Sequence, residues 1–173
     1  MKIELPDKVE AKKEGDIIVI KGRLGSARIK VNEKYLNVGV GAKSIELDGS
    51  KSKSISKKAE LVETAIASRI NSSIEGVEKG IEKKLQVAYV HFPIALEVKG
   101  DTLLIKNLFG ERIPREAKIV GDTKLEIKGQ EIIVKGVDVY DVGQTITNIR
   151  KACKAKQKDT RVFQDGIYEA HGE

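Results

Sequence analysis

An internal repeat is the feature that most constrains how this chain folds. The run Gly15–Lys21 (GDIIVIK) returns as Gly100–Lys106 (GDTLLIK), and the likeness extends to Leu24-Gly25 in the first copy and Phe109-Gly110 in the second. In both copies a Gly-Asp turn joins two short β-rich runs, which is the signature of a hairpin, and a glycine follows where the next turn should fall. The repeat therefore predicts two copies of one small domain.

Each copy continues through further short strands into one amphipathic helix. Strands are predicted at 38–40 and 45–47 in the first copy, and at 125–127 and 132–134 around a turn at 128–130 in the second. Apolar residues at helical spacing then form one stripe per copy. The stripes are Val62, Ile66, Ile70 and Ile74, and then Val142, Ile146, Ile149 and Cys153. The predicted class is α+β, with two tandem copies of a small domain, each an antiparallel sheet with one packed helix that buries its stripe.

A chain of 173 residues is long enough for two such domains. Gly76 and Gly80 indicate where the first helix ends. The run from Leu85 to Val98 is predicted to be the strand that leads into the second copy, with Pro93 marking an irregularity. We therefore expect an N-terminal α+β repeat at 1–82 and a C-terminal α+β repeat with a basic tail at 83–173.

The chain offers little for metal, redox or membrane chemistry. Cys153 is the single cysteine, so neither a disulfide framework nor a cysteine metal site is expected. His91 and His171 lie far apart and the carboxylates show no ligand spacing, so no metal and no cofactor is expected. The run 1–6 has no apolar segment, and no stretch approaches the roughly 18 apolar residues of a membrane span. We expect a cytoplasmic protein with no membrane partner and no small-molecule substrate.

Three segments resemble catalytic or nucleotide-binding motifs, and each has a simpler interpretation. Gly39–Ser44 (GVGAKS) lacks the glycines that a phosphate-binding loop requires and lies between predicted strands. Asp138 and Asp141 precede the second apolar stripe, where they suit a helix N-cap and a first-turn acid better than a catalytic pair. His91 has no serine or cysteine nucleophile motif around it. No enzymatic function is predicted.

The C-terminal part of the second copy is strongly basic, in a chain whose formal net charge is +6. Six cations fall within twelve positions: Arg150, Lys151, Lys154, Lys156, Lys158 and Arg161. If the second helix continued, Arg150, Lys154 and Lys158 would share one face beside the apolar stripe. Such a ridge suits a phosphate backbone, whereas the simpler alternative is a solvated helix end whose lysines complement the helix dipole. Composition alone leaves both interpretations open.

This region also carries a family resemblance. The run Arg161–Tyr168 (RVFQDGIY) is preceded along the chain by Asp138, Val142-Gly143-Gln144 and Asn148-Ile149. Together they resemble the C-terminal signature of the L-six family of large-subunit ribosomal proteins, in its archaeal and eukaryotic form. Further likenesses lie in the linker 89–93 and in the runs 110–118 and 118–121. The resemblance covers nearly the whole chain and is most specific in the tail.

The resemblance implies a duplicated α+β fold without catalytic residues, on the large ribosomal subunit near the base of the factor-binding stalk. It also implies a C-terminal domain against large-subunit rRNA close to the sarcin-ricin loop, with neighbouring ribosomal proteins as partners. The expected RNA contacts are the six tail cations and a second basic patch of Arg112, Arg115 and Lys118. The end of the chain, Glu169–Glu173 (EAHGE), departs from the family by not being basic, so RNA contact is expected to stop at Tyr168. The alternative function is a protein-interaction module that docks acidic translation partners.

Overall fold

The computed structural model describes residues 1–6, 8–32, 36–41, 44–49, 56–90, 92–156, 158–159 and 161–170. His91, His171 and Ala42-Lys43 of the Gly39–Ser44 run lie outside these residues. The chain divides into two compact units, the first formed by Met1–Gly80 with Val137–Val139 and the second by Ile81–Gly136 with Tyr140–Glu173.

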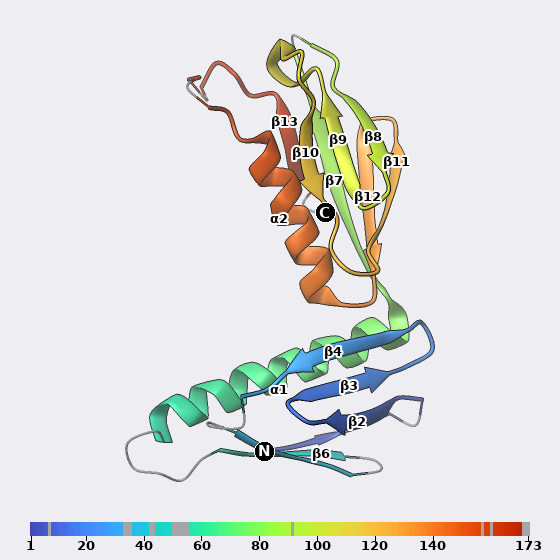
Figure 1. The fold of residues 1–173 in the computed structure, drawn as a ribbon, viewed down its shortest axis with the longest axis vertical. Coiled ribbons are helices and arrows are strands. Elements are labelled where there is room, and N and C mark those ends of the chain that lie inside the picture. Colours follow the sequence, from blue (N-terminus) through green and yellow to red (C-terminus); the bar gives the residue numbers. More distant parts are fainter. Residues whose placement is uncertain are drawn as a thin grey trace. The chain divides into compact units, whose positions relative to one another are not determined.

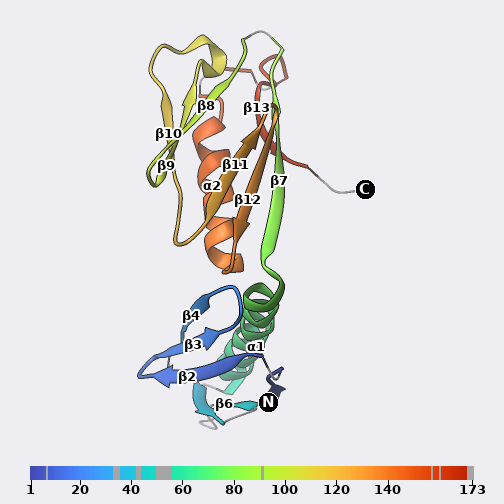
Figure 2. The same cartoon turned by 90° about the vertical axis from the view of Figure 1, so that its right-hand side faces the viewer.

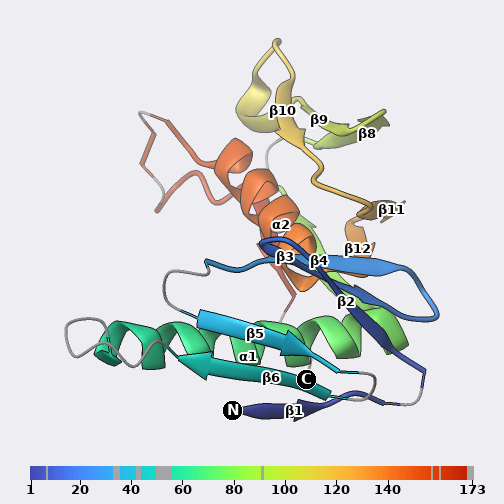
Figure 3. The ribbon, with the colours of Figure 1, turned by 60° about the horizontal axis from the view of Figure 1, so that its bottom comes forward.

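The first unit contains two antiparallel sheets and one helix. Its strands are β1 (Lys2–Glu4), β2 (Glu10–Glu14), β3 (Ile17–Lys21), β4 (Ser26–Lys30), β5 (Leu36–Val40) and β6 (Ser44–Gly49). They form two three-stranded sheets, in the orders β2-β3-β4 and β1-β6-β5. Helix α1 (Ser56–Lys79) follows β6 and runs alongside β5 and β6 (Figure 3).

The second unit repeats this arrangement and extends it. Its elements are β7 (Ile81–Ala88), β8 (Ala95–Lys99), β9 (Thr102–Lys106), the 3-10 turn η1 (Leu108–Gly110), β10 (Arg115–Lys118), β11 (Lys124–Lys128), β12 (Glu131–Gly136), α2 (Val139–Cys153) and β13 (Gly166–Glu169). One sheet has the order β10-β9-β8 and the other the order β11-β12-β7-β13. After α2 the chain turns back and enters β13 beside β7 (Figure 1).

The predicted α+β class with two similar copies is confirmed. The order β1-β6-β5 in the first unit matches β7-β12-β11 in the second, and β2-β3-β4 matches β8-β9-β10. Two details go beyond the prediction. The strands of each copy divide between two sheets, and the second copy adds β13 at the outer edge of β7.

The repeated Gly-Asp turns explain why the copies fold alike. Gly15 and Gly100 both have φ of +58°, a left-handed conformation that glycine adopts without a steric penalty. Each occupies the first position of a two-residue hairpin loop, as in a type II′ turn. The carbonyls of Asp16 and Asp101 then accept equivalent hydrogen bonds, from Val31 N–H at 2.7 Å and Ile119 N–H at 2.8 Å. Each turn therefore also fixes the residue that follows the third strand of its sheet.

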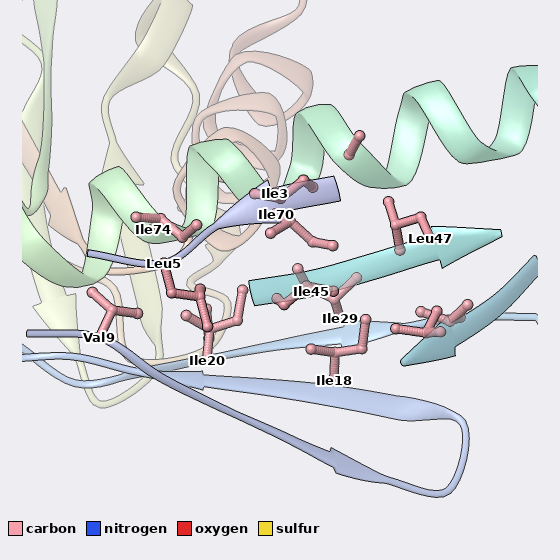
Figure 4. Close-up of a cluster of buried hydrophobic side chains, with 14 of the residues drawn as sticks. Ile3, Leu5, Val9, Ile18, Ile20, Ile29, Ile45, Leu47, Ile70 and Ile74 are labelled. Atoms are coloured by element: carbon pink, nitrogen blue, oxygen red, sulfur yellow. The ribbon is translucent and has the colours of Figure 1, made fainter. Parts of the chain in front are cut away.

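Each unit has its own apolar core, built almost entirely from Ile, Val and Leu. In the first unit, Ile70 on α1 meets the strand residues Ile18, Ile29 and Ile45 (Figure 4). All four side chains are at most 1% exposed, and full burial of an aliphatic side chain stabilises a fold by about 1.5–3 kcal/mol. In the second unit α2 lies between the two sheets (Figure 2). Its predicted stripe is buried throughout and packs against residues of both sheets.

The single strand predicted from Leu85 to Val98 is wrong. Strand β7 ends at Ala88, β8 begins at Ala95, and the two belong to different sheets. Pro93 in the intervening segment has no N–H for a ladder, and its carbonyl accepts a side-chain hydrogen bond from Asn107 Nδ2 at 3.1 Å. By contrast, α1 ends as predicted, because Gly80 has φ of +77° and its N–H donates to the Gly76 carbonyl at 3.0 Å.

Glycine at position 22 is required by close packing, which gives a first prediction. The loop after β3 lies against the end of α1, where Leu24 N–H donates to the Val77 carbonyl at 3.1 Å. A Cβ at Gly22 would lie 2.6 Å from Val77 Cγ2 and 2.9 Å from the Val77 carbonyl oxygen. We expect Gly22→Ala to lower the free energy of unfolding by about 1–3 kcal/mol, measured by urea denaturation and circular dichroism.

The matched control is Gly39→Ala on β5, where the nearest atom to a new Cβ is 3.9 Å away. That variant should stay within about 0.5 kcal/mol of the parent chain. Equal effects of the two substitutions would contradict the packing of the Gly22 loop on α1.

Candidate nucleic-acid interface

The candidate interface begins at the end of α2. Asp138 directly precedes this helix and Asp141 lies in its first turn, as predicted, while Arg150 and Lys151 lie in the last turn. The helix ends at Cys153, so the expected ridge of Arg150, Lys154 and Lys158 on one helical face does not form. The lysines beyond Cys153 lie in the loop that leads back toward β13.

The side chain of Arg115 caps this helix end. Its Nη1 donates to the carbonyls of Ala152 and Lys154, both at 2.8 Å. These carbonyls lie in the last turn of α2 and just beyond it, where a helix leaves acceptors unpaired. Its Nε and Nη2 donate to the two carboxylate oxygens of Glu111 at 2.8 and 2.6 Å. This bidentate hydrogen bond lowers the pKa of the Glu111 carboxyl group below its usual range.

Arg115 is thus bound within the chain. Its side chain is 15% exposed, and its guanidinium lies over the Phe109 ring at 5.4 Å from the centroid. Four of the five N–H groups of an arginine side chain are used in the hydrogen bonds to Glu111, Ala152 and Lys154. The predicted phosphate contact at this position therefore competes with hydrogen bonds that hold the end of α2.

Two phenylalanines and a lysine form a cluster next to Arg115. The rings of Phe109 and Phe163 meet edge to face, with centroids 6.2 Å apart and an interplanar angle of 81°. Lys158 Nζ lies 4.6 Å from the Phe163 centroid and 5.8 Å from the Phe109 centroid, within the range of cation-π attraction. Lys158 therefore fastens the loop to the aromatic pair and is half-buried.

A hollow of about 430 Å³ lies beside this cluster. It is lined by Phe109, Thr147, Arg150, Lys151, Cys153, Lys154, Ala155, Phe163, Asp165, Gly166, Ile167 and Tyr168. Three of the predicted RNA contacts, Arg150, Lys151 and Lys154, are therefore brought together at one hollow. Arg150 also pairs with Glu169, with Nη1 2.9 Å from Oε1, and remains 60% exposed.

The remaining predicted contacts lie around this centre. Lys156 and Arg161 are exposed in the loop after α2, and Arg112 is exposed between η1 and β10. Lys118 is exposed at the far end of β10, where its carbonyl accepts a hydrogen bond from Asn148 Nδ2 at 2.9 Å. The structure therefore places Lys118 beside the middle of α2 and Arg115 beside its end.

The signature run at residues 161–168 folds the tail. The buried Asp165 carboxylate accepts a hydrogen bond from Val90 N–H at 2.9 Å. Ile167 pairs with Val87 in the sheet, and the Tyr168 hydroxyl donates to the Gln164 carbonyl at 2.8 Å. Neither these roles nor the aromatic lining of the hollow was predicted from the sequence. The Phe-x-Asp-Gly-x-Tyr spacing was the available signal.

The structure was also searched for a metal site and for a membrane-spanning helix. Within the part of the chain that it describes, no group of three His, Cys, Asp or Glu side chains is placed to hold a metal ion. In the same residues, neither α1 nor α2 is long and apolar enough to span a membrane.

Removing the Arg115 side chain should loosen the end of α2. We expect Arg115→Ala to lower the free energy of unfolding of the second unit by about 2 kcal/mol. Arg115→Lys should lower it by most of that amount, because lysine lacks the planar guanidinium that makes several hydrogen bonds at once. Arg112→Ala, a change to the exposed arginine nearby, should cost less than about 0.5 kcal/mol. Urea unfolding measures both.

The effect of Arg115→Ala should also depend on pH. Because Arg115 lowers the pKa of Glu111, the ion pair stabilises the fold above the ordinary carboxyl range and this contribution is lost as the pH falls. The difference in free energy of unfolding between the Arg115→Ala and Arg112→Ala variants should therefore become smaller at acidic pH. If the two variants have the same free energy of unfolding at neutral pH, Arg115 does not stabilise the end of α2.

The thiol of Cys153 should be unreactive in the folded chain. Burial raises its pKa to about 11, and only the thiolate is an efficient nucleophile. At pH 8 we expect iodoacetamide to alkylate the folded chain about a hundredfold more slowly than the urea-unfolded chain, which mass spectrometry measures. Similar rates in the two states would show that the thiol is accessible.

Comparison with known proteins identifies the family. The model of the family described as ribosomal protein L6 matches residues 92–166. The large ribosomal subunit protein uL6 of Picrophilus torridus is 38% identical over 171 residues, covering 99% of this chain and 93% of the relative. The proteins of the same name from Methanosarcina mazei and Archaeoglobus fulgidus are 37% and 38% identical, each covering 96% of this chain and 93% and 86% of the relatives. The chain therefore belongs to the ribosomal protein L6 family and is of the archaeal type.

Proposed function

We propose that this chain is a structural constituent of the large ribosomal subunit and binds large-subunit rRNA through its C-terminal module, residues 83–173. Membership of the family supports a structural ribosomal role and not an enzymatic one. The proposed location is the cytoplasmic ribosome, near the base of the factor-binding stalk and the sarcin-ricin region. Its partners there are rRNA and neighbouring ribosomal proteins.

The observation that carries this proposal is the gathering of basic side chains around the end of α2. Arg150, Lys151 and Lys154 line one hollow, and Lys156 and Arg161 are exposed in the loop that follows. Cations on an exposed surface bind phosphates and release the counterions that surround them. Phosphate contacts of this kind position the protein, whereas specificity comes from the shape and the unpaired nucleotides of the RNA.

The predicted residues take different parts in this proposal. Arg112 and Lys118 extend the phosphate-binding surface from β10 and the loop before it. Arg115 and Lys158 support the surface from within, since Arg115 holds the end of α2 and Lys158 lies over Phe109 and Phe163. Substituting either of the last two should therefore reduce both stability and RNA affinity.

Salt dependence tests the proposal. If Lys151, Lys154, Lys156 and Arg161 each neutralise a phosphate, log affinity for a large-subunit rRNA transcript should fall against log salt with a slope of roughly −3. Lys151→Ala and Lys154→Ala should each reduce this slope by about 0.7–0.9. Lys99→Ala at the end of β8 is the matched control and should leave the slope unchanged. An affinity that does not depend on salt contradicts the proposal.

A second measurement separates this function from docking on an acidic protein. The full chain is purified without nuclease, and the bound nucleic acid is sequenced. Copurifying large-subunit rRNA that is lost when Lys151 and Lys154 are replaced by alanine supports rRNA binding. Copurification of acidic proteins without RNA favours the protein-interaction module.

A further inference from the structure

We propose that the hollow beside the end of α2 is a binding site for one unpaired RNA nucleotide, with the base inside the hollow and the phosphate on its basic rim. This inference rests on the proposed function and deepens it, because it names the feature of the RNA that this surface recognises. Its volume of about 430 Å³ lies within the roughly 300–1,000 Å³ of small-ligand sites.

The walls of the hollow suit a nucleobase. Phe109, Phe163 and Tyr168 contribute aromatic rings, and Ala155 and Ile167 complete a mostly apolar lining. Proteins that recognise RNA by sequence stack unpaired bases on such rings, since every base has a flat aromatic face. A base inside an A-form duplex is stacked between its neighbours and cannot enter, so the occupant is an unpaired nucleotide.

The aromatic walls are held in place before any ligand binds. Tyr168 as a residue is 50% exposed, yet its hydroxyl donates to the Gln164 carbonyl and its side chain lies over Gly166, where a Cβ would be 3.5 Å from three of its atoms. Phe109 has φ of +55°, which is rare for a residue with a side chain and is maintained here by contacts with Phe163 and Arg115. Fixed rings lose little conformational freedom on binding.

The distribution of charge orients the nucleotide. The lining includes the buried Asp165 carboxylate, whose Oδ1 already accepts the Val90 N–H and whose negative charge repels a phosphate. Lys151 and Lys154 line the same hollow and are exposed, so they offer positive charge at its mouth. The base therefore enters and the phosphate stays outside.

A second hollow shares Tyr168 and shows why the first is preferred. It is lined by Gln86, Val87, Ala88, Tyr89, Val90, Gln130, Gln164 and Tyr168, with a volume of about 540 Å³. Among these residues there is no lysine or arginine to bind a phosphate. Electrostatic attraction therefore directs the nucleotide to the hollow beside α2.

A fluorescent base tests the inference in the full-length chain. The probe is a single-stranded RNA of about ten nucleotides with 2-aminopurine at its centre, whose emission is quenched when it stacks. The chain contains no Trp, so its own emission does not interfere. We expect strong quenching on binding and a preference for this probe over a blunt duplex of the same sequence. Tyr168→Leu should reduce the quenching and lower affinity for the single strand about tenfold.

Three further variants test whether the Tyr168 ring and the open hollow are what the probe requires. Tyr168→Phe should restore most of the quenching, because it keeps the ring. Thr147→Phe places a ring in the hollow from the exposed face of α2 and should exclude the probe without touching the core. Tyr140→Leu, which alters an exposed tyrosine in the first turn of α2 and outside the lining, should leave both quenching and affinity unchanged.

Two outcomes would overturn the inference, and they can be told apart. If single strand and duplex bind equally without quenching, and Lys151→Ala weakens both, the hollow takes no base while the proposed rRNA-binding function stands. If the unaltered chain binds neither RNA nor a large-subunit rRNA transcript, the proposed function fails as well.

Discussion

The candidate interface depends on the end of α2, and the end of α2 depends on its hydrogen bonds to the Arg115 guanidinium. It binds the carbonyls of Ala152 and Lys154, which the helix leaves without partners, and it is held in position by Glu111. The helix ends at Cys153 beside these bonds, and the lysines that follow lie in a loop beside two aromatic rings. One partly buried cation thus holds the helix end from which the exposed cations follow.

The family signature in the tail is structural at its most characteristic positions. Asp165 fastens the tail to the segment after β7, Ile167 joins the sheet, and Tyr168 folds back onto Gln164. These bonds hold the C-terminal end of a loop rich in lysine, whose other end is fixed by α2 and Arg115. The positive charges of this loop repel one another, but the loop stays in place because both of its ends are held. Its charges therefore remain available to bind a polyanion.

The two copies share a scaffold and differ where we place the function. Leu24 in the first copy is 51% exposed, whereas its counterpart Phe109 is 7% exposed and forms a wall of the hollow. Strand β13 has no counterpart among the described strands of the first unit. The hollow therefore results from two features of the second copy that the described part of the first copy lacks, an aromatic residue at the repeated turn and an added edge strand.

The sequence by itself determined the duplication, the hairpin turns at Gly15 and Gly100, the apolar stripes of both helices and the family. These features depend on local spacing and on turn residues that need positive φ, so they are visible along the chain. Only the tertiary structure decided that Leu85–Val98 is broken, that α2 stops at Cys153 and that Arg115 faces inward. The bonds responsible join residues far apart in sequence, 37 positions for Arg115 with Ala152 and 75 for Val90 with Asp165. Such pairings arise from how the strands and helix pack, and no local pattern encodes them.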